Sequence, residues 1–158
     1  MINLPKTIKM VITDFDGVVT DNCVYVDSDG KTSRKLNFKD IMAFSLLKKN
    51  GYKIGIISGE ANTAIEILND KFQIDEVHQG IRNKWDVLKS IIEKYELSNE
   101  EFLYIGDDVN DFDSLNYAKW AITVPNAVKK IKAISHIQIT ESSGGDGAFR
   151  EVVDSLIE

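Results

Sequence analysis

Residues 14–21 read Asp-Phe-Asp-Gly-Val-Val-Thr-Asp, and they directly follow an apolar, β-favouring run that starts at Ile8. A short run of this kind is typical of a buried parallel strand. In an open α/β sheet the carboxyl ends of the strands face the ligand crevice, which would place Asp14 and Asp16 there. Gly17 allows a sharp turn just after them. Taken alone, the stretch is equally compatible with an ordinary acidic turn, because Asp and Gly are common turn formers.

Two later apolar runs end in polar side chains. Ser58 follows the second run, and the paired carboxylates Asp107 and Asp108 follow the third. Lys84 lies between them in the chain, at the predicted start of a helix, where a cation is unfavourable unless an anion lies nearby. Together with the first acidic stretch, these residues predict one polar site at the carboxyl edge of a sheet.

Strand and helix patterns alternate along the whole chain, which predicts an α/β fold. We expect a doubly wound, Rossmann-like three-layer sandwich with a central parallel sheet, built as a single domain over residues 1–158. An Asp-Gly pair between β-favouring residues predicts a β-hairpin over about 22–36 as an insertion after the first strand, with no separate cap domain. Helices are expected over about 37–49, from 58 to 72, over 84–95, from 125 and over 148–157. The glycine-rich segment that opens the tail, about 142–158, is either a hinge or an ordinary loop.

The composition limits the function classes. A formal net charge of −6 and a pI near 5.0 argue against a nucleic-acid partner, because phosphate backbones are bound by clustered Lys and Arg. The sequence shows no uninterrupted apolar stretch of the length that spans a membrane, so a cytoplasmic protein without a membrane partner is expected. Cys23 is the only cysteine, which leaves no internal disulfide. The clustered acidic residues call for a cation.

In chain order, a nucleophilic Asp, a strand-end Ser, a Lys and a GDDxxxD stretch resemble the four motifs of the haloacid dehalogenase superfamily of phosphohydrolases. The resemblance implies that Asp14 attacks the phosphate and that Asp16 serves as the proton donor and then the base. It also implies that Ser58 and Lys84 hold phosphoryl oxygens as further catalytic residues. The expected cofactor is Mg²⁺, which suits an all-oxygen site.

The same resemblance implies the ligands of the cation. They would be a carboxylate oxygen of Asp14, the backbone carbonyl of Asp16 and the carboxylate of Asp107. Asp108 and Asp111 are expected to support these ligands from behind rather than to bind the metal.

Three longer stretches narrow the resemblance: DFDGVVTDNCVY from Asp14, GDDVNDFDSL from Gly106 and GGDGAFREV from Gly144. Together with the missing cap, they resemble the small capless phosphatases of 3-deoxy-D-manno-octulosonate 8-phosphate and of the related nine-carbon, sialic-type acid 9-phosphates. The resemblance implies a small-molecule sugar acid phosphate as substrate. It also implies a homotetramer in which the hairpin and the tail of neighbouring subunits help to cover the site.

The chain departs from the octulosonate phosphatases at several positions. Glu60 follows Gly59 where those enzymes usually have an arginine, Ile41 follows Asp40 where glycine is usual, and Asp146 stands where the tail often carries arginine. Glu60 and Lys71 are more similar to the nine-carbon branch. For both branches the expected substrate-binding residues are Ser58, Gly59, Glu60, Lys71 and Lys84.

Two rival functions belong to other classes. A receiver-type signalling domain also combines an acidic pocket, Mg²⁺, a hydroxyl and a lysine on a doubly wound sheet. Its acidic pair precedes the phosphorylated aspartate, however, whereas Asp107 and Asp108 come after Asp14. The second rival is a non-catalytic assembly module like the phosphatase-like domains fused to sialic-acid nucleotidyltransferases. The presence of every expected catalytic residue favours an enzyme.

Overall fold

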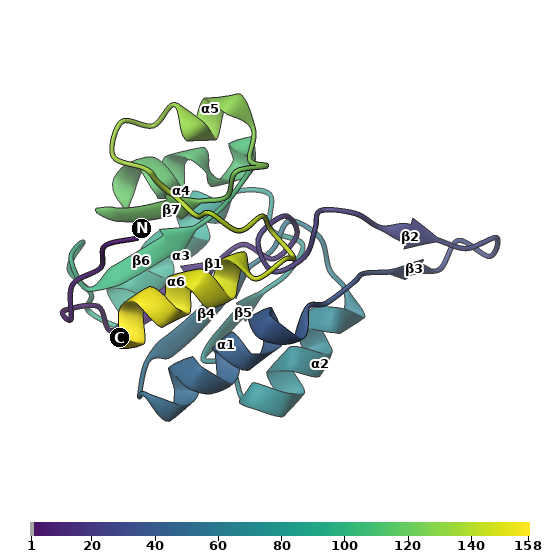
Figure 1. The fold of residues 1–158 in the computed structure, drawn as a ribbon, viewed down its shortest axis with the longest axis horizontal. Helices are drawn as coiled ribbons and strands as arrows, with labels where there is room; N and C mark the ends of the chain where they lie inside the picture. Colours follow the sequence, from purple (N-terminus) through teal and green to yellow (C-terminus); the bar gives the residue numbers. More distant parts are fainter. Residues whose placement is uncertain (1) are drawn as a thin grey trace.

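The computed structural model of the protein describes residues 2–158 (Figure 1). Within these residues the main sheet has six strands, all parallel, in the order β5-β4-β1-β6-β7-β8. The strands are β1 (Met10–Thr13), β4 (Lys53–Ile57), β5 (Glu76–His78), β6 (Phe102–Ile105), β7 (Trp120–Thr123) and β8 (Gln138–Ile139). The predicted parallel α/β sheet is confirmed.

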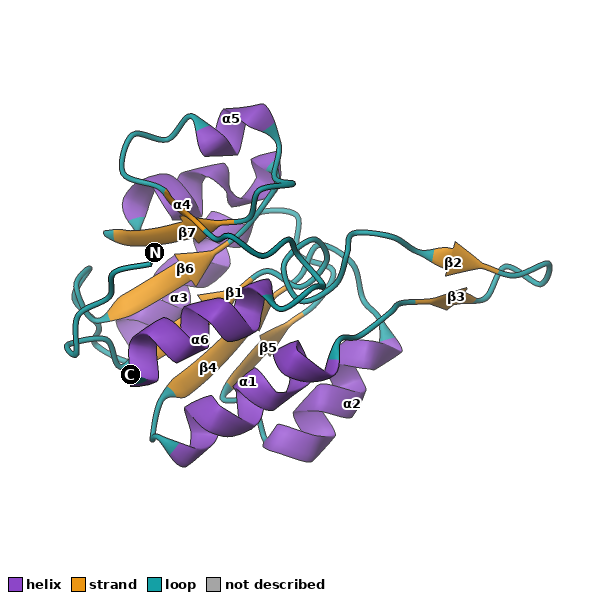
Figure 2. Cartoon of the chain, viewed as in Figure 1, coloured by secondary structure: helices purple, strands orange, loops and turns teal. Residues whose placement is uncertain are grey.

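Helices cover both faces of this sheet (Figure 2). One apolar core joins the sheet to α1 (Phe38–Lys49), α2 (Thr63–Phe72) and α6 (Ala148–Ile157). The other joins it to α3 (Lys84–Lys94), α4 (Phe112–Tyr117) and α5 (Lys129–Lys132), with the 3-10 turn η1 (Val109–Asp111) leading into α4. The predicted doubly wound three-layer sandwich is therefore confirmed.

The strand register brings the predicted motifs to one level. Thr13, the last residue of β1, pairs with Ile56 of β4 on one side and with Ile105 of β6 on the other. The loops after these three strands therefore begin side by side at the carboxyl edge of the sheet. This is the edge at which doubly wound proteins place their ligands.

Between β1 and α1 the chain forms only a two-stranded antiparallel hairpin, β2 (Tyr25–Val26) with β3 (Thr32–Ser33). It projects away from the sheet and its helices (Figure 1). All four of its strand residues are exposed to solvent. The hairpin lies within the range predicted from the Asp-Gly signal.

The C-terminal helix is attached to α1 by a buried carboxylate. The Asp40 side chain accepts hydrogen bonds from the backbone N–H groups of Gly147 (3.0 Å) and Arg150 (3.1 Å), at the start of α6. Burial raises the pKa of this carboxyl, although the hydrogen bonds from Arg150 and Gly147 oppose the shift. Asp40 thus performs the capping that Gly147, without a side chain, cannot supply.

The glycine-rich segment before α6 packs on the acidic loop that follows β1. A Cβ atom at Gly144 would lie 1.8 Å from the carbonyl oxygen of Gly17, and one at Gly145 would lie 2.3 Å from the backbone nitrogen of Asp21. The backbones approach too closely for any side chain. These glycines therefore have a packing role that neither the hinge nor the ordinary-loop interpretation includes.

Two helices begin later than predicted. Helix α2 starts at Thr63 rather than near Ser58, because the Asn62 side chain caps it and the Asn62 backbone N–H donates to the Gln79 side chain. In this helix Ile65 and Leu68 are buried, whereas Ile67 is 58% exposed. Helix α5 starts at Lys129 because the preceding turn donates a backbone hydrogen bond to the carbonyl of Asp107. No helix within residues 2–158 has both the length and the apolar character needed to cross a bilayer.

Candidate active site

A cavity of about 380 Å³ opens at the carboxyl edge of the sheet. Its lining comes from the loops that follow β1, β4, β5 and β6, so it lies where the strand register brings these loops together. The lining residues are Asp14, Asp16 and Asn22 from the first loop; Ser58, Gly59 and Glu60 from the second; Ile81 and Arg82 from the third; and Asp107, Asp108 and Asn110 from the fourth.

Lys84 forms a buried double ion pair beneath this cavity. Its ammonium nitrogen lies 2.7 Å from Asp14 Oδ1 and 2.8 Å from Asp111 Oδ1, and its side chain has no exposed surface. Burial favours the neutral amine, but the charges of Asp111 and Asp14 outweigh this and raise the pKa of Lys84. The lysine is therefore charged, which explains a cation at a helix N-terminus.

Asp111 is the fixed partner of this lysine. Its side chain accepts hydrogen bonds from Lys84, from the Tyr104 hydroxyl (2.9 Å) and from the backbone N–H groups of Asp107 (3.2 Å) and Asp108 (3.3 Å). With four donors its oxygens are saturated, although they lie close enough to Asp14 and Asp107 to share an ion. Asp111 thus fixes Lys84 and the start of the loop after β6, and its role in supporting the metal ligands stays a prediction.

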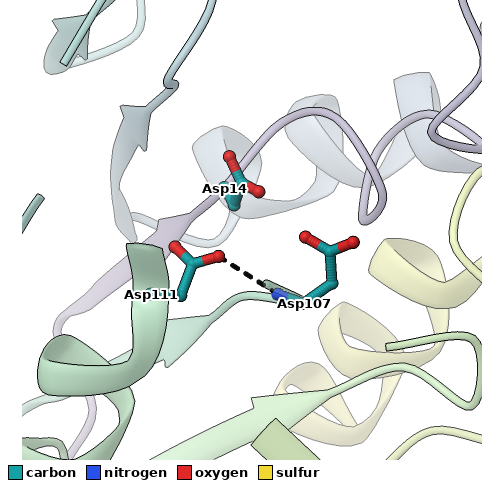
Figure 3. Close-up of side chains that lie close together, drawn as sticks. All are labelled: Asp14, Asp107 and Asp111. Carbon is teal, nitrogen blue, oxygen red and sulfur yellow. Dashed lines mark hydrogen bonds between the residues drawn. The ribbon is translucent and has the colours of Figure 1, made fainter. Parts of the chain in front are cut away.

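The surroundings of Asp14 disfavour its ionised form. Burial raises the pKa of its carboxyl well above the ordinary range, and the charge of Asp111 raises it further, while Lys84 opposes the shift. The carboxylates of Asp14, Asp107 and Asp111 lie close together (Figure 3), and Lys84 pairs with two of them, Asp14 and Asp111. The buried site therefore carries excess negative charge, which a divalent cation would balance.

Asp107 has a free carboxylate oxygen to which a metal ion could bind. Its Oδ1 is buried and has no hydrogen-bond donor anywhere in residues 2–158, so a strong acceptor is left free beside Asp14. Burial, followed by the charge of Asp111, raises the pKa of Asp107 to about 6. A Cβ at Gly17 would lie 2.0 Å from Asp107 Oδ2, so only glycine leaves room for this carboxylate. The all-oxygen donors fit Mg²⁺, and protons would compete with it below about pH 6.

Asp16 is held differently from the other acids. Arg34 Nε donates to both of its oxygens, at 2.9 Å and 3.2 Å, and the Thr20 hydroxyl donates to Oδ1 at 3.0 Å. The guanidinium comes from the base of the hairpin. Sequence reasoning missed Arg34, because nothing local indicates that a residue 18 positions away returns to the acidic turn.

The loop after β4 brings three predicted residues into the cavity and leaves one outside. Ser58, Gly59 and Glu60 line it, and the Ser58 hydroxyl donates to the Glu60 carbonyl at 2.7 Å rather than capping α2. Lys71 lies in the last turn of α2, with its ammonium 5.3 Å from the centre of the Phe72 ring, and does not line the cavity. The structure therefore does not bring Lys71 together with the other predicted substrate-binding residues.

Of the remaining lining residues, one also has a structural role and three were not predicted from the sequence. Asp108 lines the cavity and also caps the η1 turn, where its side chain accepts a hydrogen bond from the Val109 N–H. Asn22, Arg82 and Asn110 were not predicted. Arg82 lies two residues before Lys84, the first residue of α3, so its position was the one signal that could have identified it.

Comparison with known proteins agrees with this geometry. The haloacid dehalogenase-like hydrolase family matches residues 27–151. The 3-deoxy-D-manno-octulosonate 8-phosphate phosphatase of Salmonella typhi is 26% identical, with 96% of this chain and 80% of the relative covered. The crystal structure of the Moraxella catarrhalis enzyme of that name, in complex with magnesium, phosphate and KDO, has a TM-score of 0.90 and 29% identity, and covers 96% of this chain and 87% of that one.

A hydrolase structure from Streptomyces avermitilis, described as a putative member of the same superfamily, has a TM-score of 0.90 at 31% identity. The similarity extends over 99% of this chain and 89% of the Streptomyces avermitilis chain. Family, fold and site geometry thus lead to one conclusion. The chain belongs to the haloacid dehalogenase-like hydrolases.

Proposed function

We propose that the protein is a Mg²⁺-dependent phosphomonoesterase that hydrolyses a 2-keto-3-deoxy sugar acid phosphate of the 3-deoxy-D-manno-octulosonate 8-phosphate type. The observation that carries the proposal is the buried group of Asp14, Asp107 and Lys84, in which one carboxylate oxygen remains free for a cation. The relatives bearing the octulosonate phosphatase name support the substrate class.

The geometry supports a two-step reaction. When bound, the cation would be held by Asp14, Asp107 and the carbonyl of Asp16, and it would offset the repulsion between the phosphate and the carboxylates. An Asp14 oxygen attacks phosphorus and the bond to the sugar oxygen breaks, while Asp16 gives its proton to that oxygen. Asp16 then takes a proton from water, whose oxygen attacks the phosphorus of the aspartyl-phosphate and releases phosphate. Ser58 and Lys84 contact the equatorial phosphoryl oxygens during both steps.

Arg82 is the basic residue that the cavity lining offers to the substrate carboxylate. Lys84 is already paired with two carboxylates, whereas within residues 2–158 Arg82 has no ion-pair partner. Glu60, on the neighbouring loop, cannot bind a carboxylate but can accept hydrogen bonds from sugar hydroxyls. The two loops are joined by the hydrogen bond from the Ile81 N–H to the Ser58 carbonyl at 3.0 Å.

The experiment that tests the function measures phosphate release from the eight-carbon and the nine-carbon sugar acid phosphates under identical conditions. We expect turnover of the eight-carbon ester that requires Mg²⁺ and stops when EDTA is added. Preference for the nine-carbon ester would instead assign the chain to the sialic-type branch, for which Glu60 in the cavity is the supporting observation. No release from either ester or from a simple alkyl phosphate would favour a non-catalytic assembly module.

Replacing Arg82 tests the substrate carboxylate contact. In Arg82→Gln we expect KM for the sugar acid phosphate to rise roughly 10- to 100-fold, the range that a charge-assisted hydrogen bond supplies. Hydrolysis of an alkyl phosphate without a carboxylate should stay within about twofold of wild type, because that ester never uses the contact. An equal loss on both esters would contradict the assignment, and Lys89→Gln on the exposed face of α3 is the matched control.

We also propose that four copies of the chain associate and complete each other's sites. Apolar side chains on the hairpin and at the start of α1 support an interface: Val24 (51% exposed), Tyr25 (57%), Val26 (62%), Phe38 (87%) and Met42 (50%). Large apolar side chains left exposed in this way are typical of interaction sites. Light scattering should give a mass near four times 17.8 kDa, whereas a monomer mass would refute the assembly.

A further inference from the structure

The base of the hairpin contacts the acidic loop through two successive cations. Arg34 pairs with Asp16, and Lys35 pairs with Asp21 at 3.1 Å. The two pairs differ in burial. The Arg34 side chain is 10% exposed, whereas that of Lys35 is 55% exposed. The pair to Asp16 is therefore shielded from water, and the pair to Asp21 is an ordinary surface contact.

The contacts of Asp16 restrict its side chain. Arg34 Nε bridges both carboxylate oxygens, and Thr20 adds a third donor from within the same loop. A planar guanidinium on a carboxylate gives directional as well as electrostatic restraint. The lining of the catalytic cavity includes Asp16 but does not include Arg34. Arg34 lines an adjoining hollow that shares Asp16, Asn22 and Glu60 with the cavity, and its hydrogen bonds to the cavity lining go to Asp16.

We propose that Arg34 is the positioning residue of Asp16. It restrains this carboxylate in the lining of the cavity, where Asp16 exchanges protons with the leaving oxygen and then with the attacking water. The inference rests on the proposed function, because it assigns to Asp16 the proton transfers described above. It goes beyond that function by making the hairpin part of the catalytic apparatus of its own chain.

The test compares Arg34→Ala with Lys35→Ala. We expect kcat of Arg34→Ala to fall roughly 10- to 100-fold, the cost of a misplaced catalytic group, with KM within about threefold of wild type. Lys35→Ala removes the neighbouring surface pair on the same segment and should keep kcat within about twofold. Arg34→Lys should recover part of the lost rate, because a single ammonium replaces the charge but not the planar geometry.

Chemical rescue separates positioning from a purely structural role. Guanidinium chloride at millimolar concentration should restore part of kcat in Arg34→Ala and leave Lys35→Ala unchanged, whereas urea, which is uncharged, should not. A wild-type kcat in Arg34→Ala, a rise in KM at constant kcat, or an equal loss in Lys35→Ala would each overturn the inference. If Arg34→Ala does not fold, the same criteria apply to Arg34→Lys and Arg34→Gln.

The outcome also distinguishes this inference from the proposed function. Each variant is assayed with whichever alkyl phosphate the wild type hydrolyses best. If the wild type hydrolyses another ester but not the sugar acid phosphate, the proposed substrate is wrong. A lower kcat of Arg34→Ala on that other ester would still support the positioning role of Arg34. Normal hydrolysis of the sugar acid with an unaffected Arg34→Ala would refute the inference alone. A wild type that releases no phosphate from any ester would refute both.

Discussion

The Asp14→Asn variant should release phosphate at least roughly 10⁴-fold more slowly than wild type, the scale of loss when a covalent nucleophile is removed. The amide nitrogen carries no available lone pair for attack, and the other carboxylate beside Lys84, that of Asp111, accepts four hydrogen bonds and does not line the cavity. Acid quenching during turnover should trap a phosphoryl group on the peptide that contains residue 14 in wild type and on no peptide of the variant.

The same variant should fold as well as wild type. Burial and the neighbouring charge of Asp111 raise the pKa of Asp14, which means that the fold disfavours its ionised form. Removing that charge while keeping the side-chain shape relieves repulsion, and the asparagine oxygen can still accept a hydrogen bond from Lys84. We therefore expect the metal-free melting temperature at pH 7 to be equal to that of wild type or higher.

Asp113→Asn is the matched control for this experiment. Asp113 is an exposed residue of the stretch GDDVNDFDSL, in the first turn of α4, and does not line the cavity. Its variant should keep wild-type turnover. Phosphate release by Asp14→Asn above about 1% of the wild-type rate would show that another residue is the nucleophile.

Part of the predicted site emerged from the sequence because Asp14, Ser58 and Asp107 each come at the end of an apolar run. Parallel strands pair in register, so the residue after each strand reaches the same edge of the sheet, whatever the distance along the chain. Thr13 of β1 and Ile105 of β6 are adjacent for this reason. Asp14, Ser58 and Asp107 could therefore be grouped without any structure.

The other features of the site and the fold depend on long-range contacts that sequence patterns do not encode. The pairing of Arg34 with Asp16 depends on where the hairpin returns, and the position of Lys71 outside the cavity depends on the direction of α2. The late start of α2 follows from the hydrogen bond between Asn62 and Gln79. In each case a long-range contact decided the local outcome.

Replacing Lys84 by methionine should cause the largest loss of stability. The change keeps the length of the side chain but leaves Asp14 and Asp111 without their shared cation in a buried site. Removing one partner of a buried ion pair typically lowers the free energy of unfolding by about 3–5 kcal/mol. For a chain of this length, that corresponds to a melting temperature roughly 10 °C lower at pH 7.

The loss should diminish with falling pH, and the sign follows from the raised pKa values. Carboxylates whose folded pKa lies above the unfolded value destabilise the fold when ionised, so protonation removes the penalty. Asp107, with a pKa of about 6, would begin to protonate between pH 7 and pH 5, and the raised pKa of Asp14 acts in the same direction. We therefore expect thermal unfolding of Lys84→Met to approach that of wild type over this interval.

The double variant Asp14→Asn with Lys84→Met decides whether electrostatics is the cause. If unpaired charge produces the instability, removing the Asp14 charge should restore part of the melting temperature lost in Lys84→Met, and the two changes will not be additive. Lys89→Met, on the exposed face of the same helix, controls for the loss of a lysine and should shift unfolding by less than about 1 kcal/mol. Additive effects would mean that Lys84 stabilises the fold by packing. The buried ion pair would then serve catalysis alone, because its charges would contribute no net stability.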